Sequence, residues 1–339
     1  MTTPTKLAQS YAVFRYDYTH YSSYRPKFVN LGDYVQSLAA SQYWGAPHGT
    51  EYTLDRDQLS HLPASAGLIA NGWYWLHDDH HLFPEESRPL LSAVHIENDS
   101  VADFPQTLQQ WQALSKRSAI GCRDRYTEAL LTQAGCEAYF SGCLTTTLRR
   151  ENFATSEELY GVVFSDLPQL NVEALGSHVS ADTRLLPPFG PHRKWLQRFK
   201  DARFQKTHAA LHDRLLQHYQ GEPITVVSHE VPLGLSAEEA FAKACALLSI
   251  LARAKLVVTS RLHAALPCLA LGTPVILVTK YDRKRFSGME DWVNHVWTDT
   301  EEVSVLEEGG EVKNPEHFRP YAARLREQCE RYVKEQPAQ

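Results

Sequence analysis

The feature that most constrains this chain is the alternation of short β-rich runs with longer segments of helical periodicity along almost its whole length. Such alternation is typical of βαβ units, in which helices connect and cover parallel strands. In the first half, the predicted strands are Tyr11–Tyr16, Ala66–Ala70, Ser118–Cys122 and Ala138–Ser141. In the second half, they are Gly161–Phe164, Ile224–Ser228, Leu256–Thr259 and Val275–Thr279.

Helical segments separate these strands. In chain order they begin near Leu31 and then cover about Asp124–Ala134, Arg193–Tyr219, a segment opening at Ser236 and Arg319–Val333. Gly135 is placed to end the second, and Ser236 with Glu239 forms a capping box. With 339 residues, the chain suits two α/β domains, which we place at 1–150 and 151–317, followed by a C-terminal helix at 318–339.

Charge and cysteine usage exclude several functions. The chain has 34 basic and 40 acidic side chains, a formal net charge of −6, and so no overall attraction for nucleic acid or anionic lipid. Six scattered cysteines form neither a disulfide framework nor a CxxC metal cage. The amino-terminal MTTPTKLAQS has no signal-peptide pattern, and three basic residues interrupt the apolar region 240–258. We therefore expect a cytoplasmic protein without a transmembrane segment.

The clearest candidate site is KLVVTSRLH at 255–263, where a short apolar strand runs into a helix. Ser260 is placed to cap this helix, and Arg261 and His263 fall in its first turn. Cations there oppose the helix dipole by ~0.3–1 kcal/mol each, whereas an anion among them would gain from the dipole and the free N–H groups. Pro267 also leaves the His263 carbonyl without its helical partner. We favour an anion site over an arginine paired with a nearby carboxylate, because ligands of such sheets bind at strand ends.

Arg123 follows the strand Ser118–Cys122 in the same way. It is suited to a bidentate contact with a carboxylate or phosphate, although an ion pair with Asp124 explains it equally well.

Near the amino terminus, Asn30 stands at an N-cap position and Gly32 permits close approach of backbone to a ligand. Asp33 is placed to accept a proton from a sugar hydroxyl. Helix capping is the alternative interpretation of this segment.

Weaker signals complete the candidate site. Asn71 and Trp73 follow the strand at 67–70 and suit a sugar, and His229 follows Ile224–Ser228. Three patterns are discounted: HDDHH at 77–81 is interpreted as a solvated loop, DRD at 55–57 as a common tripeptide, and the pair His208 and His212 as a helix surface. The sequence contains neither a P-loop nor a GxGxxG motif.

Five motifs together resemble the polysaccharide pyruvyl transferase family. In chain order they are NLGDY at 30–34, ANGWYW at 70–75, GCRDRYTEALL at 121–131, YFSGCLTTTL at 139–148 and VVTSRLHAALPCLALGTPVIL at 257–277. The resemblance implies a GT-B-like α/β fold, in which two Rossmann-like domains face each other across a cleft that holds the active site. The C-terminal helix of such folds returns to the N-terminal domain.

The resemblance also implies an activity: transfer of pyruvate from phosphoenolpyruvate to two hydroxyls of a sugar, as a ketal, in exopolysaccharide, capsule or cell-surface glycan synthesis. By motif position, Arg261 is a donor-binding residue, His263 the acid and Arg123 a second donor-binding arginine. Asn30, Asp33 and Asn71 receive no individual role. Phosphoenolpyruvate is the donor substrate; we assign no separate cofactor, no metal ligand and no nucleic-acid partner.

Two alternatives remain at this point. A GT-B glycosyltransferase using nucleotide sugars would need a base and ribose site, for which the sequence gives no signal. A non-catalytic sugar-binding member of a glycan assembly complex would not need Arg123, Arg261 and His263 together. The acceptor sugar is open: it is lipid-linked, nucleotide-linked or polymeric. A lipid-linked oligosaccharide would make this a peripheral protein at the cytoplasmic face of the inner membrane.

Overall fold

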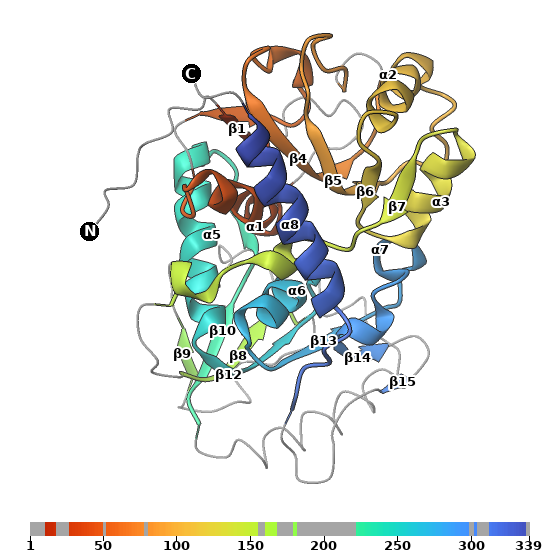
Figure 1. Cartoon of the computed structure of the whole chain (residues 1–339). Coiled ribbons are helices and arrows are strands. Elements are labelled where there is room, and N and C mark those ends of the chain that lie inside the picture. Colours follow the sequence, from red (N-terminus) through yellow and green to blue (C-terminus); the bar gives the residue numbers. More distant parts are fainter. Residues whose placement is uncertain are drawn as a thin grey trace. The chain divides into compact units, whose positions relative to one another are not determined.

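The computed structural model describes residues 11–17, 27–49, 52–77, 81–154, 160–167, 179–181, 222–297, 302–303 and 312–336. The chain divides into two compact units, coloured by sequence in Figure 1. Unit 1 comprises residues 1–25, 36–147 and 319–339, and unit 2 comprises residues 26–35 and 148–318.

Unit 1 is built on a six-stranded sheet in the order β3-β1-β4-β5-β6-β7. The strands are, in that order, Thr53–Asp55, Tyr11–Arg15, Gly67–Tyr74, Leu90–Ile96, Ile120–Cys122 and Ala138–Phe140. Every pairing between them is parallel. The central strands β4 and β5 are buried almost throughout, as expected of parallel strands whose two faces are both covered.

The α-helices described for this unit are α1 (Leu31–Ser41), α2 (Pro105–Ser115), α3 (Arg125–Gln133) and α8 (Arg319–Glu335). The first turn of α1 lies in unit 2 and the remainder in unit 1. The C-terminal helix α8 packs against β5 and the short helices at 42–44 and 144–147. It is fastened by the Tyr332 hydroxyl, which accepts from the Leu68 N–H (3.0 Å) and donates to the Arg88 carbonyl (2.9 Å).

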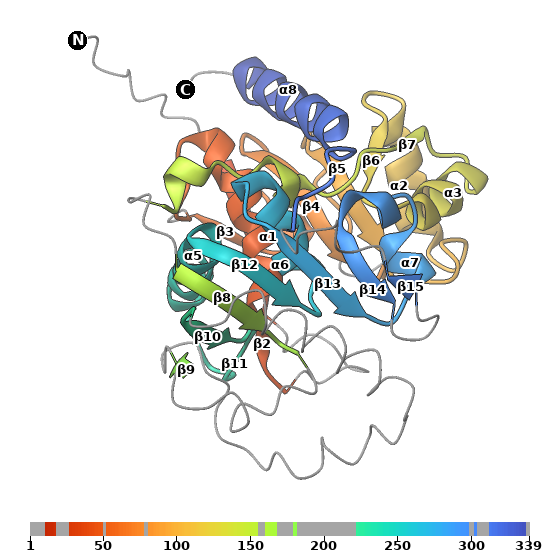
Figure 2. The same cartoon turned by 90° about the horizontal axis from the view of Figure 1, so that it is seen from below.

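Unit 2 is built on a seven-stranded sheet in the order β15-β14-β13-β12-β8-β10-β9. The strands are Glu302–Val303, Asn294–Trp297, Val275–Thr279, Ala254–Thr259, Tyr160–Ser165, Ile224–Val227 and Val179–Ala181. All pair in parallel except the edge strand β15. Helices α5 (Ala237–Ala252) and α6 (Leu262–Leu271) cover one face of the sheet (Figure 2), and α7 (Arg283–Phe286) follows β13. A separate antiparallel pair joins β2 (Val29–Asn30) to β11 (Glu230–Val231).

The core of unit 2 follows from strand alternation. Successive side chains of a strand point to opposite faces, so every second residue of β8, β12 and β13 shares one face. Those residues form a single apolar cluster that includes Val162, Phe164, Leu256, Val258, Ile276 and Val278. At Gly161, a Cβ would lie 2.0 Å from the Pro223 carbonyl oxygen, so only glycine permits this approach of the backbones.

The α/β class and all eight predicted strands are confirmed, with bounds that differ by a few residues. The capping box of Ser236 and Glu239 is present at the start of α5. The sequence missed the strands β2, β3, β5, β9, β11, β14 and β15 and the helices α2 and α7. The predicted helix at 193–219, with His208 and His212, lies outside the described residues.

The six cysteines, all of them among the described residues, are free thiols. In the described part of the chain, no helix combines the length and the apolar character needed to cross a membrane.

Candidate functional site

Three neighbouring strands of unit 2 end in polar residues. Strands β10, β8 and β12 are parallel, and Ser165 at the end of β8 is in register with Val227 and Thr259 at the ends of the other two. The residues that follow, Asp166, His229 and Arg261, therefore share the carboxyl edge of the sheet, where ligands of such sheets bind.

Asp166 is the centre of this group. Its Oδ2 lies 2.9 Å from the Nδ1 of His229 and accepts from the His229 backbone N–H at 2.9 Å. Its Oδ1 accepts from the Ser228 hydroxyl at 2.7 Å. Asp166 has a φ of 51°, a left-handed conformation that is uncommon for a residue other than glycine. Such conformations persist where surrounding contacts enforce them, often at functional sites.

Asp166 also binds Arg261. Burial opposes ionisation of Asp166, but the hydrogen bond and charge of His229 and the charge of Arg261 outweigh it and lower the pKa of the carboxyl far below its usual value. The Arg261 Nε lies 3.4 Å from Asp166, and its Nη2 pairs with the Glu230 carboxylate. Arg261 thus makes ion pairs with both carboxylates, as the alternative interpretation of this residue expected, and the anion site stays a prediction.

The first turn of α6 presents Arg261 and His263. The N-cap of the helix is Arg261, not Ser260 as the sequence indicated. The Ser260 hydroxyl donates instead to the Asp166 carbonyl at 2.6 Å, which ties the ends of β12 and β8 together. His263 has non-helical dihedrals (φ −83°, ψ 17°) four residues before Pro267, which has no N–H to offer the His263 carbonyl.

The amino-terminal motif meets this turn within unit 2. The Asn30 side chain accepts from the Gly32 N–H at 3.1 Å, so Asn30 caps α1. A Cβ on Gly32 would lie 3.1 Å from the Cβ of His263 and 3.3 Å from its Nδ1, so the backbone here approaches the imidazole closely. Asp33 is buried in the same turn. The Leu31 N–H donates to the His229 carbonyl at 2.8 Å, which links the motif to Asp166 through His229.

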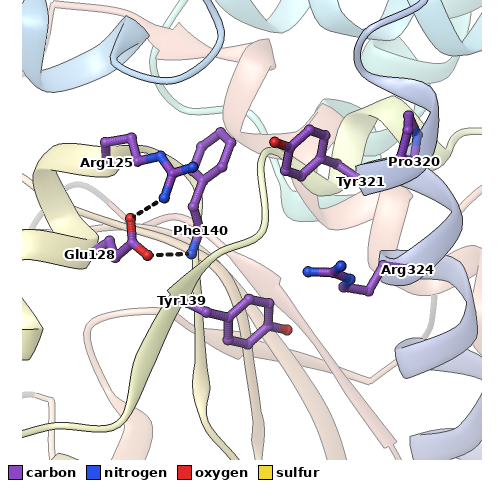
Figure 3. A pocket seen from close by; sticks show the side chains of 7 residues that line it. All are labelled: Arg125, Glu128, Tyr139, Phe140, Pro320, Tyr321 and Arg324. Atoms are coloured by element: carbon purple, nitrogen blue, oxygen red, sulfur yellow. Dashed lines mark hydrogen bonds and ion pairs between the residues drawn. The ribbon is translucent and has the colours of Figure 1, made fainter.

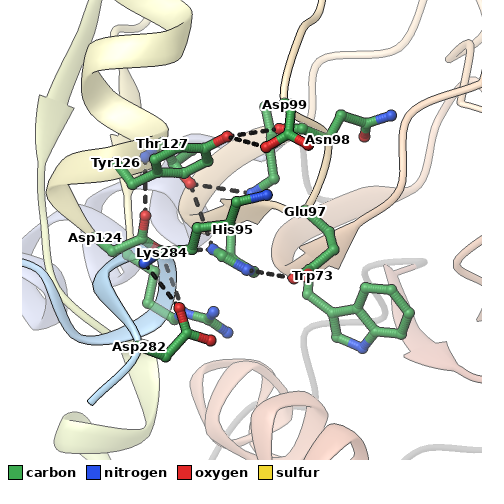
Figure 4. Close-up of polar contacts among 12 residues, drawn as sticks. Trp73, His95, Glu97, Asn98, Asp99, Asp124, Tyr126, Thr127, Asp282 and Lys284 are labelled. Atoms are coloured by element: carbon green, nitrogen blue, oxygen red, sulfur yellow. Dashed lines mark hydrogen bonds and ion pairs between the residues drawn. The ribbon is translucent and has the colours of Figure 1, made fainter.

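Unit 1 has a second polar group, at the ends of β5 and β6 (Figure 4). His95 is buried between two carboxylates: its Nδ1 lies 2.7 Å from Asp124 and its Nε2 lies 3.0 Å from Glu97. Asp124 caps α3 through the Thr127 N–H. Burial opposes ionisation of Asp124, but the hydrogen bond and charge of His95 and the charge of Arg123 outweigh it and lower its pKa.

Arg123 is 1% exposed, and its Nε lies 3.6 Å from Asp124, too far for a hydrogen bond. Among the described residues, neither its Nε nor its Nη2 has a hydrogen-bond partner. A buried guanidinium with unused donors is costly, and it is suited to receive an anion. An ion pair with Asp124 therefore leaves these two guanidinium nitrogens of Arg123 unexplained.

The two remaining candidates lie on β4. Asn71 is buried and donates to the Gln36 carbonyl at 2.8 Å, which gives it a structural role. Trp73 is half-buried, and the Arg56 guanidinium lies over its indole ring at 4.2 Å. Gly72 between them has a φ of 152°, at an irregularity in the pairing of β4 with β5.

The interpretation of 77–81 as a solvated loop is wrong for His81. This side chain is buried and lies 3.1 Å from Asp57, which in turn binds the buried Arg56. The DRD tripeptide and His81 thus form a structural ion network beneath Trp73. Within the described ranges, no three His, Cys, Asp or Glu side chains are grouped so that they could hold a metal ion.

A shallow pocket of about 430 Å³ lies where α8 faces β7 and α3 (Figure 3). Phe140 lines this pocket; the Arg125 guanidinium lies 4.5 Å from its ring centroid, and the centroid of the Tyr321 ring lies 5.2 Å from it. Arg125 is paired with Glu128. The packing of these rings explains how the start of α8 is held in unit 1.

The sequence missed Asp166, His95 and Glu97. Asp166 follows a predicted strand, so the strand-end rule would have found it. His95 and Glu97 follow β5, whose buried run LLSAVHI was not recognised as a strand.

The strand orders and parallel pairings define an α/β protein with two Rossmann-like parallel sheets. The chain belongs to the polysaccharide pyruvyl transferase family, whose sequence pattern matches residues 7–282.

A solved structure of a functionally uncharacterised protein from Klebsiella pneumoniae subsp. pneumoniae NTUH-K2044 aligns with a TM-score of 0.42 and 12% identity, covering 82% of this chain and 86% of that one. A comparison with curated proteins gives no match.

Proposed function

We propose that this transferase moves pyruvate from phosphoenolpyruvate to two hydroxyls of a sugar, forming a ketal. Family membership supports a pyruvyl transferase acting in polysaccharide synthesis. The observation that carries the finer proposal is the kinked first turn of α6, which presents Arg261 and His263 at the carboxyl edge of the unit 2 sheet.

Arg261 is assigned to the donor. Phosphoenolpyruvate carries a carboxylate and a phosphate, and a planar guanidinium matches both groups. Asp166 and Glu230 hold Arg261 through its Nε and Nη2. Asp166 is the more buried of these carboxylates and positions the guanidinium, whereas Glu230 is one-third exposed and yields to the incoming anion.

Arg123 of unit 1 is assigned to the donor as well. Its buried, unsatisfied donors make an anion a favourable partner. The chain as a whole is acidic, so such local cations are what an anionic substrate requires.

His263 is assigned as the general acid. The first sugar hydroxyl forms an O–C2 bond and loses its proton to a base, and C3 of phosphoenolpyruvate takes a proton from the imidazole. The second hydroxyl then bonds to C2 as the C2–O bond to phosphate breaks; its proton returns to His263, and the proton held by the base leaves with phosphate as hydrogen phosphate. General-acid catalysis of this kind contributes roughly 10²–10⁴-fold. Gly32 and Pro267 position His263, and Ser260, Asn30, Asp33 and His229 support the same turn.

The test is acceptor-dependent phosphate release. The purified protein is incubated with phosphoenolpyruvate, or with nucleotide sugars, and a panel of saccharides; we expect phosphate release only from phosphoenolpyruvate. His263→Ala should lose phosphate release while phosphoenolpyruvate still binds. Nucleotide release from a nucleotide sugar, or full activity of His263→Ala, would overturn the proposal.

A further inference from the structure

The carboxyl edge of the unit 1 sheet holds a row of four ionisable side chains that contact one another. The Arg123 Nε lies 3.6 Å from Asp124. Asp124 binds the Nδ1 of His95, and the Nε2 of His95 binds Glu97 (Figure 4). Exposure rises sharply at one end: the Asp124 side chain is 0% exposed, that of His95 is 2% and that of Glu97 is 40%. Glu97 is the most exposed side chain of this row.

His95 holds Glu97 in place. The His95 Nδ1 lies 2.7 Å from Asp124, whose lowered pKa keeps that carboxylate a hydrogen-bond acceptor. On the other side of the ring, Nε2 lies 3.0 Å from Glu97, within hydrogen-bond distance. This contact uses Oε2 of Glu97 and orients the carboxylate.

Hydrogen bonds to the backbone fix Asp124 and Arg123 in this row. Asp124 accepts from the Thr127 N–H at 2.8 Å, and the Thr127 hydroxyl accepts from the Ile96 N–H at 3.0 Å. The Arg123 N–H donates to the Val94 carbonyl at 2.7 Å. Buried charges of this kind contribute little to stability compared with apolar side chains of similar volume, so their arrangement calls for another explanation.

An aromatic side chain lies next to the Glu97 end of the row. Trp73 is in register with His95 on the neighbouring strand, and the Glu97 N–H donates to the Tyr74 carbonyl at 2.9 Å. Figure 4 shows the indole on the Glu97 side of the row. The indole is half-buried and its orientation is fixed by the Arg56 guanidinium stacked on one face; an indole beside a carboxylate that accepts from hydroxyls matches a sugar ring.

We propose that Glu97, held by His95 and Asp124, is the general base that takes the proton from the attacking sugar hydroxyl, and that Trp73 supports the sugar ring. This inference rests on the proposed function. As the O–C2 bond forms, the O–H bond breaks and its proton goes to Glu97, while C3 takes a proton from the general acid. As the second O–C2 bond forms, the proton of the second hydroxyl returns to that acid, and the proton on Glu97 leaves with phosphate as hydrogen phosphate. Both groups thereby regain their starting states.

The test compares Glu97→Gln and Glu97→Ala with Glu137→Gln, a matched change of an exposed glutamate elsewhere in unit 1. We expect both Glu97 variants to lose 10²–10⁴-fold of acceptor-dependent phosphate release, with thermal stabilisation by phosphoenolpyruvate unchanged. Added formate should restore part of the activity of Glu97→Ala, because a small carboxylate replaces the missing base. His95→Gln should lower kcat while leaving KM for phosphoenolpyruvate unchanged. Glu137→Gln should match the wild type.

Two results separate this inference from the proposed function. Full activity of Glu97→Gln, or no rescue of Glu97→Ala by formate, overturns the role of Glu97 while pyruvyl transfer stands. If the wild type releases no phosphate from phosphoenolpyruvate with any saccharide, the proposed function fails. Direct binding of methyl hexopyranosides, measured by saturation-transfer NMR, then decides the sugar site: binding that disappears in Glu97→Ala and Trp73→Ala supports it, and unchanged binding or none overturns it.

Discussion

Replacement of Arg123 by methionine tests whether this buried cation is kept for a ligand. The guanidinium is 1% exposed, its contact with Asp124 at 3.6 Å is not a hydrogen bond, and its Nε and Nη2 have no partner among the described residues. A buried donor left unsatisfied costs about 1–3 kcal/mol, and more when it is charged. Asp124 keeps His95 and the Thr127 N–H in the variant. We therefore expect ligand-free Arg123→Met to be at least as stable as the wild type.

The ligand-bound state should behave in the opposite way. A bidentate contact with phosphoenolpyruvate supplies two charge-assisted hydrogen bonds of about 1.5–3 kcal/mol each, so its loss weakens binding at least about 100-fold. At a donor concentration of about 100 times Kd, the wild type gains about 2.7 kcal/mol of stability. At the same concentration, the variant would gain only about 0.4 kcal/mol.

Thermal unfolding with and without phosphoenolpyruvate measures both effects. Arg117→Met, at an exposed position of unit 1, is the matched control and should keep the full stabilisation by the donor. An Arg123→Met protein that unfolds well below the wild type would show that the residue is structural. A variant that retains the donor-induced stabilisation would refute the ligand contact.

Three further predictions concern other parts of the molecule. Gly32→Ala should lower kcat about 10-fold or more with the fold retained, because its Cβ would press on His263; circular dichroism and phosphate release check this, and unchanged kcat counts against it. Glu230→Gln should lower KM for phosphoenolpyruvate by releasing Arg261, and a raised KM would mean that Glu230 is needed to orient it. Burial raises the pKa of Asp55 to about 6, so folded Asp55 binds a proton more readily than unfolded Asp55, and stability falls as pH rises from about 4 to 6. In the wild type, this fall in the free energy of unfolding between pH 4 and pH 7.5 amounts to at most about 3 kcal/mol, and Asp55→Asn should abolish it. Urea titrations of both proteins at the two pH values measure it; an identical pH dependence in both would contradict the prediction.

Much of the fold was predictable because its signals are local. Apolar runs such as Val275–Thr279 and the capping box at Ser236 depend on neighbouring residues only. Strand β5 was missed because Ser92 and His95 interrupt its apolar run, and both are buried by residues far away in the sequence. Burial on both faces removes the alternation that marks other strands.

The sequence predicts where candidate residues lie relative to the strand ends, but not which groups they contact. Strand-end placement put Arg261 and His229 each after its own strand, and the pairing of β8 with β10 and β12 brings these strand ends to one sheet edge. It gave no sign that Asp166 would join them, because this depends on the register of β8 against β10 and β12. Ser260 was predicted to be an N-cap, but its hydroxyl donates to the Asp166 carbonyl, which is distant in the sequence. Contacts between distant segments are what local patterns do not encode.

The central claim is that pyruvate becomes bonded through one carbon to two sugar oxygens. Phosphoenolpyruvate labelled with ¹³C at C2 and C3 is incubated with the protein and a saccharide panel, and the products are followed by NMR. The account predicts a new methyl signal coupled to a quaternary carbon that correlates with two carbons of the same sugar, with one phosphate released per ketal. Labelled free pyruvate as the only product, or label that stays in phosphoenolpyruvate while a nucleotide sugar is consumed, would contradict it.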